Sequence, residues 1–331
     1  MNIILTGANG FIGRQFSEID LPDCRLIGID ISKDLLYNST VAWELCDLTD
    51  SVQVTKVIGK YPPDWIIHCA GIAHQKIGSI GLSTYMKVNS QATANLARIA
   101  AKANRYVRFI YLSTVSVYGE KNLDIPVSEE SICSPSSDYA ISKLDAERRL
   151  IALYGQGVVH QLYILRLAPV YDRDWRLNLD KRVLAPKSIA YLRFGSGDQK
   201  MSALARPNLV EFIIFLIQND PKKNWVDIIN VCDARPYAFK EIIDAYRRMG
   251  IHPNRPVISV PLSPVRLATR LAGFVLPQWR QWFHSCFEKL ASDLIFNNEK
   301  MLQTGFTPLH ELESVFLPKI IPAESVKTTV Q

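Results

Sequence analysis

Tyr139 and Lys143 are the side chains of this sequence whose types and spacing best suit proton transfer. They are four residues apart, so in a helix they lie on the same face. An ordinary phenol has a pKa near ~10 and is a poor base at neutral pH, but a neighbouring ammonium stabilises the phenolate and lowers that pKa. A tyrosine and a lysine at this spacing occur on many helices, so the prediction also depends on the residues around them.

Thr114 strengthens the prediction because it follows an apolar run at residues 108–112, which predicts a buried strand. In open sheets of parallel strands, ligands collect at the carboxyl ends of the strands. A helix capped by Asp138 or Ser137 would bring Tyr139 to the same end of the sheet. We therefore expect the Thr114 hydroxyl to share a proton with the Tyr139 phenol and to bind a substrate oxygen.

A glycine-rich segment near the start of the chain has the pattern of a dinucleotide-binding turn. Residues 3–5 are apolar and predict a buried strand, after which come Gly7, Gly10 and Gly13, with a helical pattern from Phe11 onward. Glycine lets the backbone turn tightly and approach a pyrophosphate, and the N–H groups at a helix start attract that anion. The alternative is an ordinary tight turn between a strand and a helix.

Asp30 favours NAD over NADP as the dinucleotide. It closes an apolar run at residues 25–29 and lies 17 residues after Gly13, near the usual place of the carboxylate that binds the adenosine ribose. A carboxylate there would repel the 2′-phosphate of NADP. Arg14 could instead reach such a phosphate, so NADP stays possible, although a solvated helix residue is the simpler interpretation. Asp47 could accept a hydrogen bond from the adenine amino group.

Strands and helices alternate through residue 167, which predicts an α/β fold with a doubly wound parallel sheet. Further strands are predicted at 41–46, 65–69 and 160–167, and helices at 52–59 (capped by Ser51), 84–103 and 138–153. Asn89 falls inside the second of these helices, where an asparagine usually faces solvent, but a buried one could hold a water or a backbone carbonyl. We expect residues 1–171 to form the dinucleotide-binding domain.

Residues 172–322 are predicted to form mainly a smaller α/β lobe, with some segments returning to the first domain. Helices are expected at 207–218 and 238–249, and a late strand at 226–231. Residues 323–331 are expected to be a flexible tail.

Composition excludes several classes of protein. The 331 residues are 48% apolar and 21% charged, with a formal net charge of +6 and no block of Lys and Arg that would predict nucleic-acid binding. The six cysteines include no C-x-x-C pair, so we expect reduced thiols and no metal site. No apolar run reaches the ~18 residues of a membrane span, and the first residues leave no room for a signal peptide, so a cytoplasmic protein is predicted.

Residues 261–290 are mostly apolar, with Arg266, Arg270 and Arg280 interspersed. Such a segment most often packs as a helix of the lobe. The alternative is peripheral contact with a membrane surface.

The sequence resembles the extended short-chain dehydrogenases/reductases of the nucleotide-sugar epimerase/dehydratase family, over nearly the whole chain. The matching motifs are T-G-A-N-G-F-I-G (6–13), Asp30, D-L-T-D (47–50), H-C-A-G (68–71), S-T-V-S-V-Y-G (113–119), Y-A-I-S-K (139–143), L-R-L-A-P-V-Y (165–171) and T-G-F-T-P (304–308). The resemblance implies a Rossmann-type fold and a catalytic triad of Thr114, Tyr139 and Lys143. It also implies a cofactor site lined by Gly7, Gly10, Phe11, Ile12, Gly13, Asp30, Asp47, Leu48, Ala70 and Lys143.

The sequence departs from the family pattern at three places. Val115 and Ser116 stand where the dehydratases have Asp-Glu, which argues against 4,6-dehydration, and Pro169 stands where the family often has asparagine. The basic residue that usually reaches the nucleotide pyrophosphate is matched by Lys200, with Arg206 and Arg173 as other candidates. His74 and Ser113 complete the predicted substrate contacts.

The resemblance implies an NAD-dependent 4-epimerase acting on a UDP-linked hexose or N-acetylhexosamine through a transient 4-keto sugar. An NAD(P)H-dependent 4-ketoreductase and a non-enzymatic dinucleotide sensor are the alternatives. A homodimer through the helices at 84–103 and 138–154, and a part in polysaccharide biosynthesis, are expectations at the level of the family.

Overall fold

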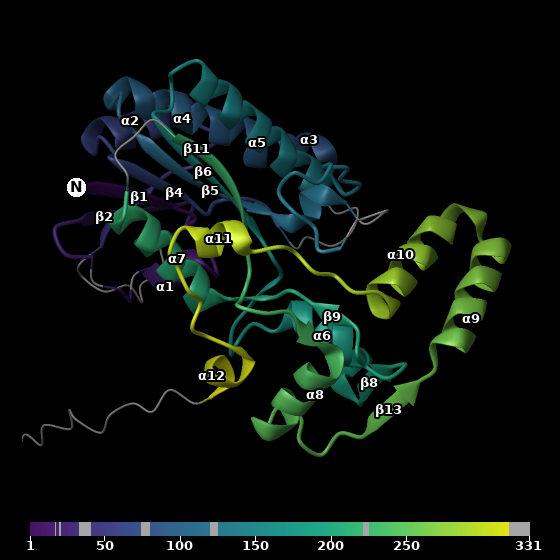
Figure 1. The fold of residues 1–331 in the computed structure, drawn as a ribbon. Coiled ribbons are helices and arrows are strands. Elements are labelled where there is room, and N and C mark those ends of the chain that lie inside the picture. The colour runs from purple at the N-terminus through teal and green to yellow at the C-terminus, as the bar shows by residue number, and fades with distance from the viewer. Residues whose placement is uncertain are drawn as a thin grey trace, which may run out of the picture.

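The protein is built around a parallel sheet with helices on both faces, beside which lies a smaller lobe (Figure 1). The structure, a computed structural model, describes residues 1–16, 18–19, 21–32, 41–73, 80–119, 125–220 and 225–317. The predicted flexible tail at 323–331 falls outside these residues.

The sheet has seven strands, all paired in parallel. In order across the sheet they are β11 (Trp225–Val231), β6 (Gln161–Leu167), β5 (Arg108–Thr114), β4 (Trp65–His68), β1 (Asn2–Thr6), β2 (Arg25–Asp30) and β3 (Ala42–Leu45). The strand order reverses between β1 and β4, which confirms the predicted doubly wound, Rossmann-type sheet. Ligands of such sheets bind at this reversal, beyond the carboxyl ends of the strands.

Each strand feeds two hydrophobic cores because its side chains alternate between the two faces of the sheet. In β1, Ile3 and Leu5 belong to the core under α7, and Ile4 between them belongs to the core under the opposite helices. The helices on the first face are α1 (Gly13–Phe16), α7 (Arg206–Gln218) and α11 (Glu299–Gln303), and those on the second are α2 (Ser51–Lys60), α4 (Ala92–Ala103) and α5 (Asp138–Gly155). The chain thus returns to the sheet after residue 171.

Two local features differ from the prediction. Asp50, not Ser51, caps α2, because its carboxylate accepts hydrogen bonds from the backbone N–H groups of Val52 and Gln53 at 2.9 and 3.2 Å. The predicted helix over 84–103 is three consecutive segments: α3 (Leu82–Tyr85), the π-helical η1 (Met86–Gln91) and α4. The wider π turn buries Asn89, and π segments are frequent at functional sites.

The lobe has its own hydrophobic core, which includes the buried rings of Tyr171, Tyr191 and Tyr246. Its elements are β7 (Val170–Tyr171), α6 (Leu177–Val183), η3 (Pro186–Ser188), β8 (Tyr191–Phe194), β9 (Lys200–Met201), β10 (Leu204–Ala205), β12 (Tyr237–Ala238), α8 (Phe239–Arg248), β13 (Val257–Val260) and α12 (Leu312–Phe316). Three two-stranded pairings, β10 with β7, β12 with β9 and β13 with β8, tie these short elements together.

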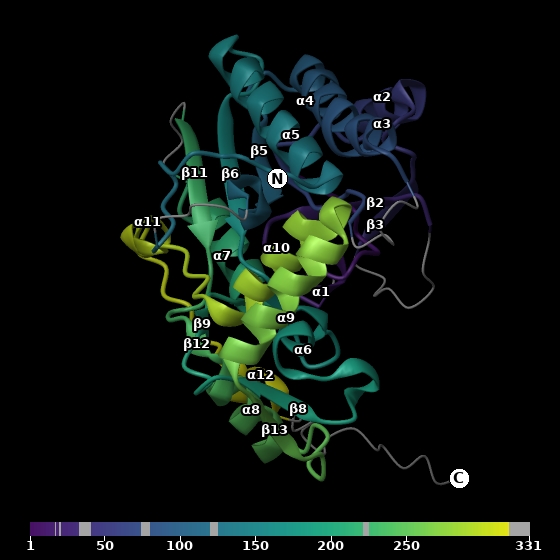
Figure 2. The same cartoon turned by 90° about the vertical axis from the view of Figure 1, so that its right-hand side faces the viewer.

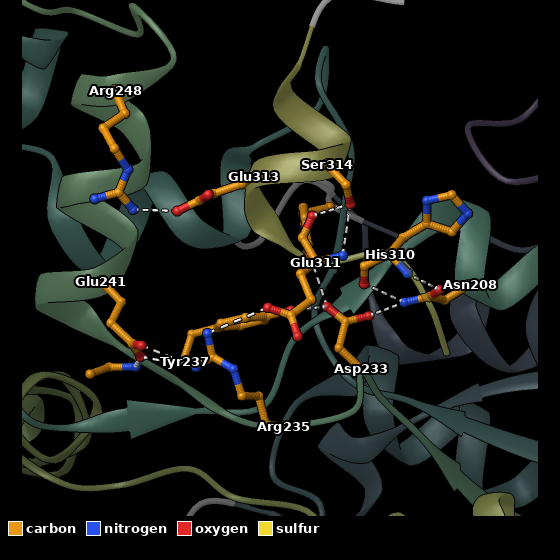
Figure 3. Close-up of polar contacts among 12 residues, drawn as sticks. Asn208, Asp233, Arg235, Tyr237, Glu241, Arg248, His310, Glu311, Glu313 and Ser314 are labelled. Atoms are coloured by element: carbon orange, nitrogen blue, oxygen red, sulfur yellow. Dashed lines mark hydrogen bonds and ion pairs between the residues drawn. The ribbon is translucent and has the colours of Figure 1, made fainter. Parts of the chain in front are cut away.

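A buried carboxylate joins the sheet to the lobe (Figure 3). Asp233, which follows β11 and is 1% exposed, accepts hydrogen bonds from the Asn208 amide at 2.7 Å and from the hydroxyls of Tyr171 and Tyr237 at 2.9 and 3.0 Å. The Asn208 amide also donates to the backbone oxygen of His310 at 2.7 Å. Burial raises the pKa of Asp233 to about 6. The junction therefore depends on a carboxylate surrounded by neutral donors.

Residues 261–290 form a hairpin of two helices and not a single lobe helix. The hairpin consists of α9 (Leu262–Val275), the 3₁₀ turn η4 (Pro277–Trp279) and α10 (Arg280–Ala291). Pro277 follows Leu276, the residue that caps the end of α9, and its ring and missing N–H disfavour a continued helix. Figure 2 looks onto the side of the molecule that carries this hairpin. Among the described residues, no helix has the length and apolar character needed to cross a membrane.

Candidate active site

The glycine turn after β1 is packed so closely that side chains would not fit. Gly7 has a φ of +66°, and a Cβ there would lie 2.7 Å from the Cα of Ala70, at the end of β4. A Cβ on Gly13 would lie 2.3 Å from the carbonyl oxygen of Gly7. Gly10, by contrast, is exposed and would meet only Gly7. The turn therefore presents bare backbone at the switch point, as a bound pyrophosphate requires.

Asp30 lies beside this turn at the end of β2. Its carboxylate accepts hydrogen bonds from the backbone N–H groups of Asn9 and Ser32 at 3.0 and 3.3 Å. Arg14 donates through Nε to the backbone oxygen of Asn9 at 2.8 Å, so it braces the turn. Beyond the next strand, the Asp47 carboxylate accepts from the backbone N–H of Thr49 at 2.8 Å.

Buried polar side chains hold the end of β4 and the backbone that follows it through hydrogen bonds. His68 bridges the hydroxyls of Thr6 and Thr93 at 2.7 and 2.8 Å, and burial lowers its pKa to about 3, so it stays neutral. Asn89 accepts from the N–H of Ile72 at 2.7 Å and donates to its carbonyl at 3.1 Å. Asn89 is therefore buried and not solvent-facing, and it holds a backbone carbonyl, which is one of the two roles considered for a buried asparagine here. These bonds fix the loop that passes Gly7.

Thr114, Tyr139 and Lys143 meet at the carboxyl end of β5. Ser137 caps α5 by accepting from the N–H of Ala140 at 3.3 Å, which starts the helix just before Tyr139. The Tyr139 phenol lies near enough to the Thr114 hydroxyl for this hydroxyl to favour the phenolate and lower the pKa of Tyr139. The ring of Tyr85 stands edge-on to that of Tyr139, with centroids 6.5 Å apart. Sequence reasoning did not find Tyr85, because nothing in the sequence indicates that its helix reaches α5.

The pKa of Tyr139 is raised, where the sequence predicted that it is lowered. Burial raises it to about 12, and the nearby Thr114 hydroxyl acts in the opposite direction without overcoming burial. Burial also lowers the pKa of Lys143 to about 8, against the influence of Cys69 and Glu147. In this structure both groups are therefore held closer to their neutral forms than in water.

Lys143 has the placement expected of a cofactor ligand. It is 6% exposed, its Nζ lies 4.5 Å from the ring centroid of Tyr111, and a Cβ on Gly71 would be 3.8 Å from that Nζ. Within the described parts of the chain, no side-chain or backbone oxygen forms a hydrogen bond with this ammonium. A buried ammonium that lacks an acceptor, beside bare backbone at two strand ends, fits the ribose hydroxyls of a dinucleotide.

A buried ion pair supports α5 beneath these residues. Arg166 of β6 donates to the Glu147 carboxylate at 2.7 Å, and both side chains are at most 5% exposed. Ser113 is hydrogen-bonded to the same carboxylate. The Ser113 hydroxyl, predicted as a substrate contact, is therefore committed to this buried pair. The only signal in the sequence was that Glu147 lies one helical turn after Lys143.

The basic residues predicted to reach a substrate pyrophosphate lie in different places. Arg206 donates to the backbone oxygen of Phe11 at 2.8 Å, lies 4.7 Å from the Phe11 ring centroid and pairs with Asp172. These contacts make Arg206 a support of the glycine turn. Lys200 is exposed on β9 and lines a lobe pocket of about 560 Å³, and Arg173 is exposed as well. His74 falls outside the described residues.

Two comparisons of sequence identify the kind of protein to which this geometry belongs. The model of the NAD dependent epimerase/dehydratase family matches residues 3–232. The UDP-glucose 4-epimerase of Vibrio cholerae is 28% identical over 280 residues, which are 82% of this chain and 82% of that protein. The N-acetyl-alpha-D-glucosaminyl-diphospho-ditrans,octacis-undecaprenol 4-epimerase of Escherichia coli O157:H7 is 26% identical over 224 residues, which are 66% of this chain and 63% of that protein.

A comparison of structures supports the fold. The crystal structure of a UDP-glucose 4-epimerase from Thermotoga maritima with UDP-glucose superposes with a TM-score of 0.73, at 19% identity, and covers 96% of both chains. This likeness extends through the lobe, beyond the residues that the family model matches.

Proposed function

The chain belongs to the NAD dependent epimerase/dehydratase family, and we propose that it is an NAD-dependent 4-epimerase of UDP-linked hexoses or N-acetylhexosamines. The observation that carries the proposal is the contact between Thr114 and Tyr139 one helical turn from the buried Lys143, at the carboxyl end of β5. Those positions allow one group to move a proton while another holds the cofactor, next to a glycine turn that accepts a pyrophosphate.

The residues divide the reaction among them. A nicotinamide bound in this site would supply a reversible hydride acceptor for C4 of the sugar. Tyr139 takes the proton of the C4 hydroxyl and later gives it back, and Thr114 orients the phenol and steadies the C4 oxygen. Lys143 holds the ribose. Because burial keeps the pKa of Tyr139 at about 12 in this structure, the activation of Tyr139 belongs to the loaded site, where additional positive charge favours the phenolate.

NAD is the proposed cofactor rather than NADP. Asp30 accepts two backbone hydrogen bonds in the position where the adenosine ribose would bind, and its charge repels a 2′-phosphate. Arg14 is the basic residue that the sequence analysis considered as a ligand for the 2′-phosphate of NADP. Its Nε donates a hydrogen bond to the backbone oxygen of Asn9.

The substrate class rests on the diphosphate that both relatives' substrates share. A UDP-sugar and a lipid-linked sugar diphosphate present the same hexose and pyrophosphate to the site, so lipid-linked sugars are the second candidate. A single reduction of a 4-keto sugar would use the same three residues, and product analysis distinguishes it from epimerisation. Dehydration is disfavoured because Val115 and Ser116 carry no acid that could expel a hydroxyl.

The test replaces the proposed base and a matched tyrosine outside the site. Tyr139→Phe should lower turnover of UDP-glucose or UDP-N-acetylglucosamine by about 10²–10⁴-fold, the usual contribution of a positioned acid–base group, while NAD binding is retained. Tyr106→Phe, at a half-exposed position before β5, should leave turnover unchanged. Full turnover by Tyr139→Phe would remove this residue from the mechanism, and the proposal with it.

The remaining parts of the proposal concern the setting of the enzyme. We expect a homodimer that associates through η1, α4 and α5, a cytoplasmic location, and a part in polysaccharide biosynthesis. Sedimentation of the purified protein tests the first of these directly.

A further inference from the structure

The described residues of the hairpin at 262–291 belong to none of the hydrophobic cores of the sheet and the lobe. Figure 1 shows α9 and α10 side by side at the right-hand edge of the molecule, and Figure 2 shows the same two helices facing the viewer. The two helices pack chiefly against each other, and they close tightly where Gly273 meets Arg280: a Cβ on that glycine would lie 3.1 Å from Cγ of the arginine. Both ends of the hairpin are anchored in the lobe, through β13 and through the bridge between Leu294 and Met201.

Helix α9 has apolar residues on two opposite faces. One face carries Val265 and Ala272, which are partly buried. The other face carries Leu267, Leu271 and Phe274, spaced four and three residues apart. These three side chains are 60%, 57% and 84% exposed.

The exposed apolar surface continues past the end of α9. Val275, Leu276 and Trp279 are 72%, 41% and 52% exposed. Large contiguous apolar surfaces of this kind mark sites of interaction with a protein or a membrane. We call the six side chains, Leu267, Leu271, Phe274, Val275, Leu276 and Trp279, the apolar ridge.

The stretch of sequence that contains the ridge is basic, although Arg248 is paired with Glu313 and α10 also contains Glu288. Residues 245–287 contain six arginines and no aspartate or glutamate, whereas the rest of the chain has 32 basic and 32 acidic residues. This segment therefore carries the whole formal net charge of +6. Arg266 and Arg270 flank the ridge on α9, each one residue before a ridge leucine, and both are exposed.

We propose that the hairpin docks on the surface of an anionic phospholipid bilayer, with the apolar ridge in the interface and the arginines at the lipid phosphates. An apolar face of Leu, Phe and Trp beside arginines is the pattern of helices that lie in a membrane interface. Each arginine near an anionic surface adds to the attraction. A second copy of the chain is a poorer occupant, because two such faces would bring arginines together without acidic partners.

This docking is independent of the sugar-nucleotide reaction. The ridge belongs to elements that contribute none of the residues of the candidate active site. Binding to vesicles can therefore succeed or fail whatever the substrate proves to be.

The experiment measures flotation of the full chain with vesicles. Wild type should bind vesicles of phosphatidylglycerol and phosphatidylethanolamine, bind pure phosphatidylcholine much more weakly, and detach as salt is raised. Leu271→Ser combined with Phe274→Ser should lower the apparent partition coefficient at least tenfold. The matched control is Ile132→Ser, which removes an 86% exposed apolar side chain far along the chain from the hairpin, and should bind as wild type does.

The charge is tested at Arg270. Arg270→Glu should weaken binding to anionic vesicles several-fold, and Arg270→Lys should restore it. Equal binding of the ridge variant and wild type would overturn the proposal. So would an absence of vesicle binding together with a dimer that dissociates in the ridge variant, because the ridge would then be an interface between copies of the chain.

Discussion

The sheet and its junction with the lobe each bury a carboxylate, but the two carboxylates have different hydrogen-bond and charge partners. Glu147, beneath the end of β5, is paired with Arg166 and is 1% exposed. Asp233, at the junction, is equally buried and is surrounded by an amide and two phenols. Burial raises the pKa of Asp233 to about 6, whereas Glu147 has a full positive charge beside it.

This difference places a dependence of stability on pH at the junction. Next to the active-site residues, opposite charges compensate each other, and the ion pair joins α5 to β6. At the junction, the Asp233 charge is opposed only by dipoles, so its ionisation costs stability. The hairpin adds a third situation, in which the arginine side chains Arg266 and Arg270 lie exposed beside an apolar surface.

The largest effect is expected from breaking the buried ion pair. Arg166→Leu leaves Glu147 buried without a cation and should lower the free energy of unfolding by about 3–5 kcal/mol. Arg149→Leu removes the partner of Asp145 from a pair that is 29–40% exposed, and should cost at most ~1 kcal/mol. Chemical denaturation measures both. Equal losses in the two variants would show that the buried pair has no special part in holding α5.

A smaller effect, and one that depends on pH, is expected at the junction. Because the folded pKa of Asp233 is about 6 and the ordinary value is 3.8, the folded state binds more protons between these values, and stability falls as pH rises through this range. Asp233→Asn should remove this component. Its free energy of unfolding, relative to wild type, should therefore rise by on the order of 2–3 kcal/mol from pH 4 to pH 7.

Denaturation of both proteins at matched pH values tests this sign. A difference that stays constant from pH 4 to pH 7 would mean that Asp233 does not titrate in this range.

The smallest effect is expected on the hairpin. Leu271→Ser combined with Phe274→Ser should change the free energy of unfolding by no more than ~0.5 kcal/mol per site, as is usual for exposed positions. Thermal unfolding measures this change. A loss of several kcal/mol would indicate that the apolar ridge packs within the protein and is not a surface for a partner.

The sequence predicted those parts of the fold and site that depend on local pattern. Gly7, Asp30 and Tyr139 each follow a recognisable strand or start a helix, so their types and order sufficed to place them at one edge of the sheet. The strand at 226–231 was found for the same reason, as an apolar run between turns.

Contacts between distant segments that no motif marks were not predictable. Glu147 and Arg166 come from different elements, and only the structure shows that they form an ion pair. It also shows that the Ser113 hydroxyl is bonded to Glu147 and is not a free substrate contact. The pKa of Tyr139 was predicted in the wrong direction because burial, which depends on the whole fold, outweighs one neighbour. The break between the two helices of the hairpin had a local signal in Pro277. The interpretation of residues 261–290 as one helix relied on their apolar composition instead.

The most direct test of the central claim follows a label at C4 of the sugar. UDP-glucose and UDP-N-acetylglucosamine carrying deuterium at C4 are incubated with the purified protein and NAD, and the products are analysed by NMR. We predict inversion at C4 with the deuterium retained in the product, because the hydride leaves and returns within one closed site. Loss of the label to water, or no inversion with either sugar or with a lipid-linked sugar diphosphate, would contradict the account.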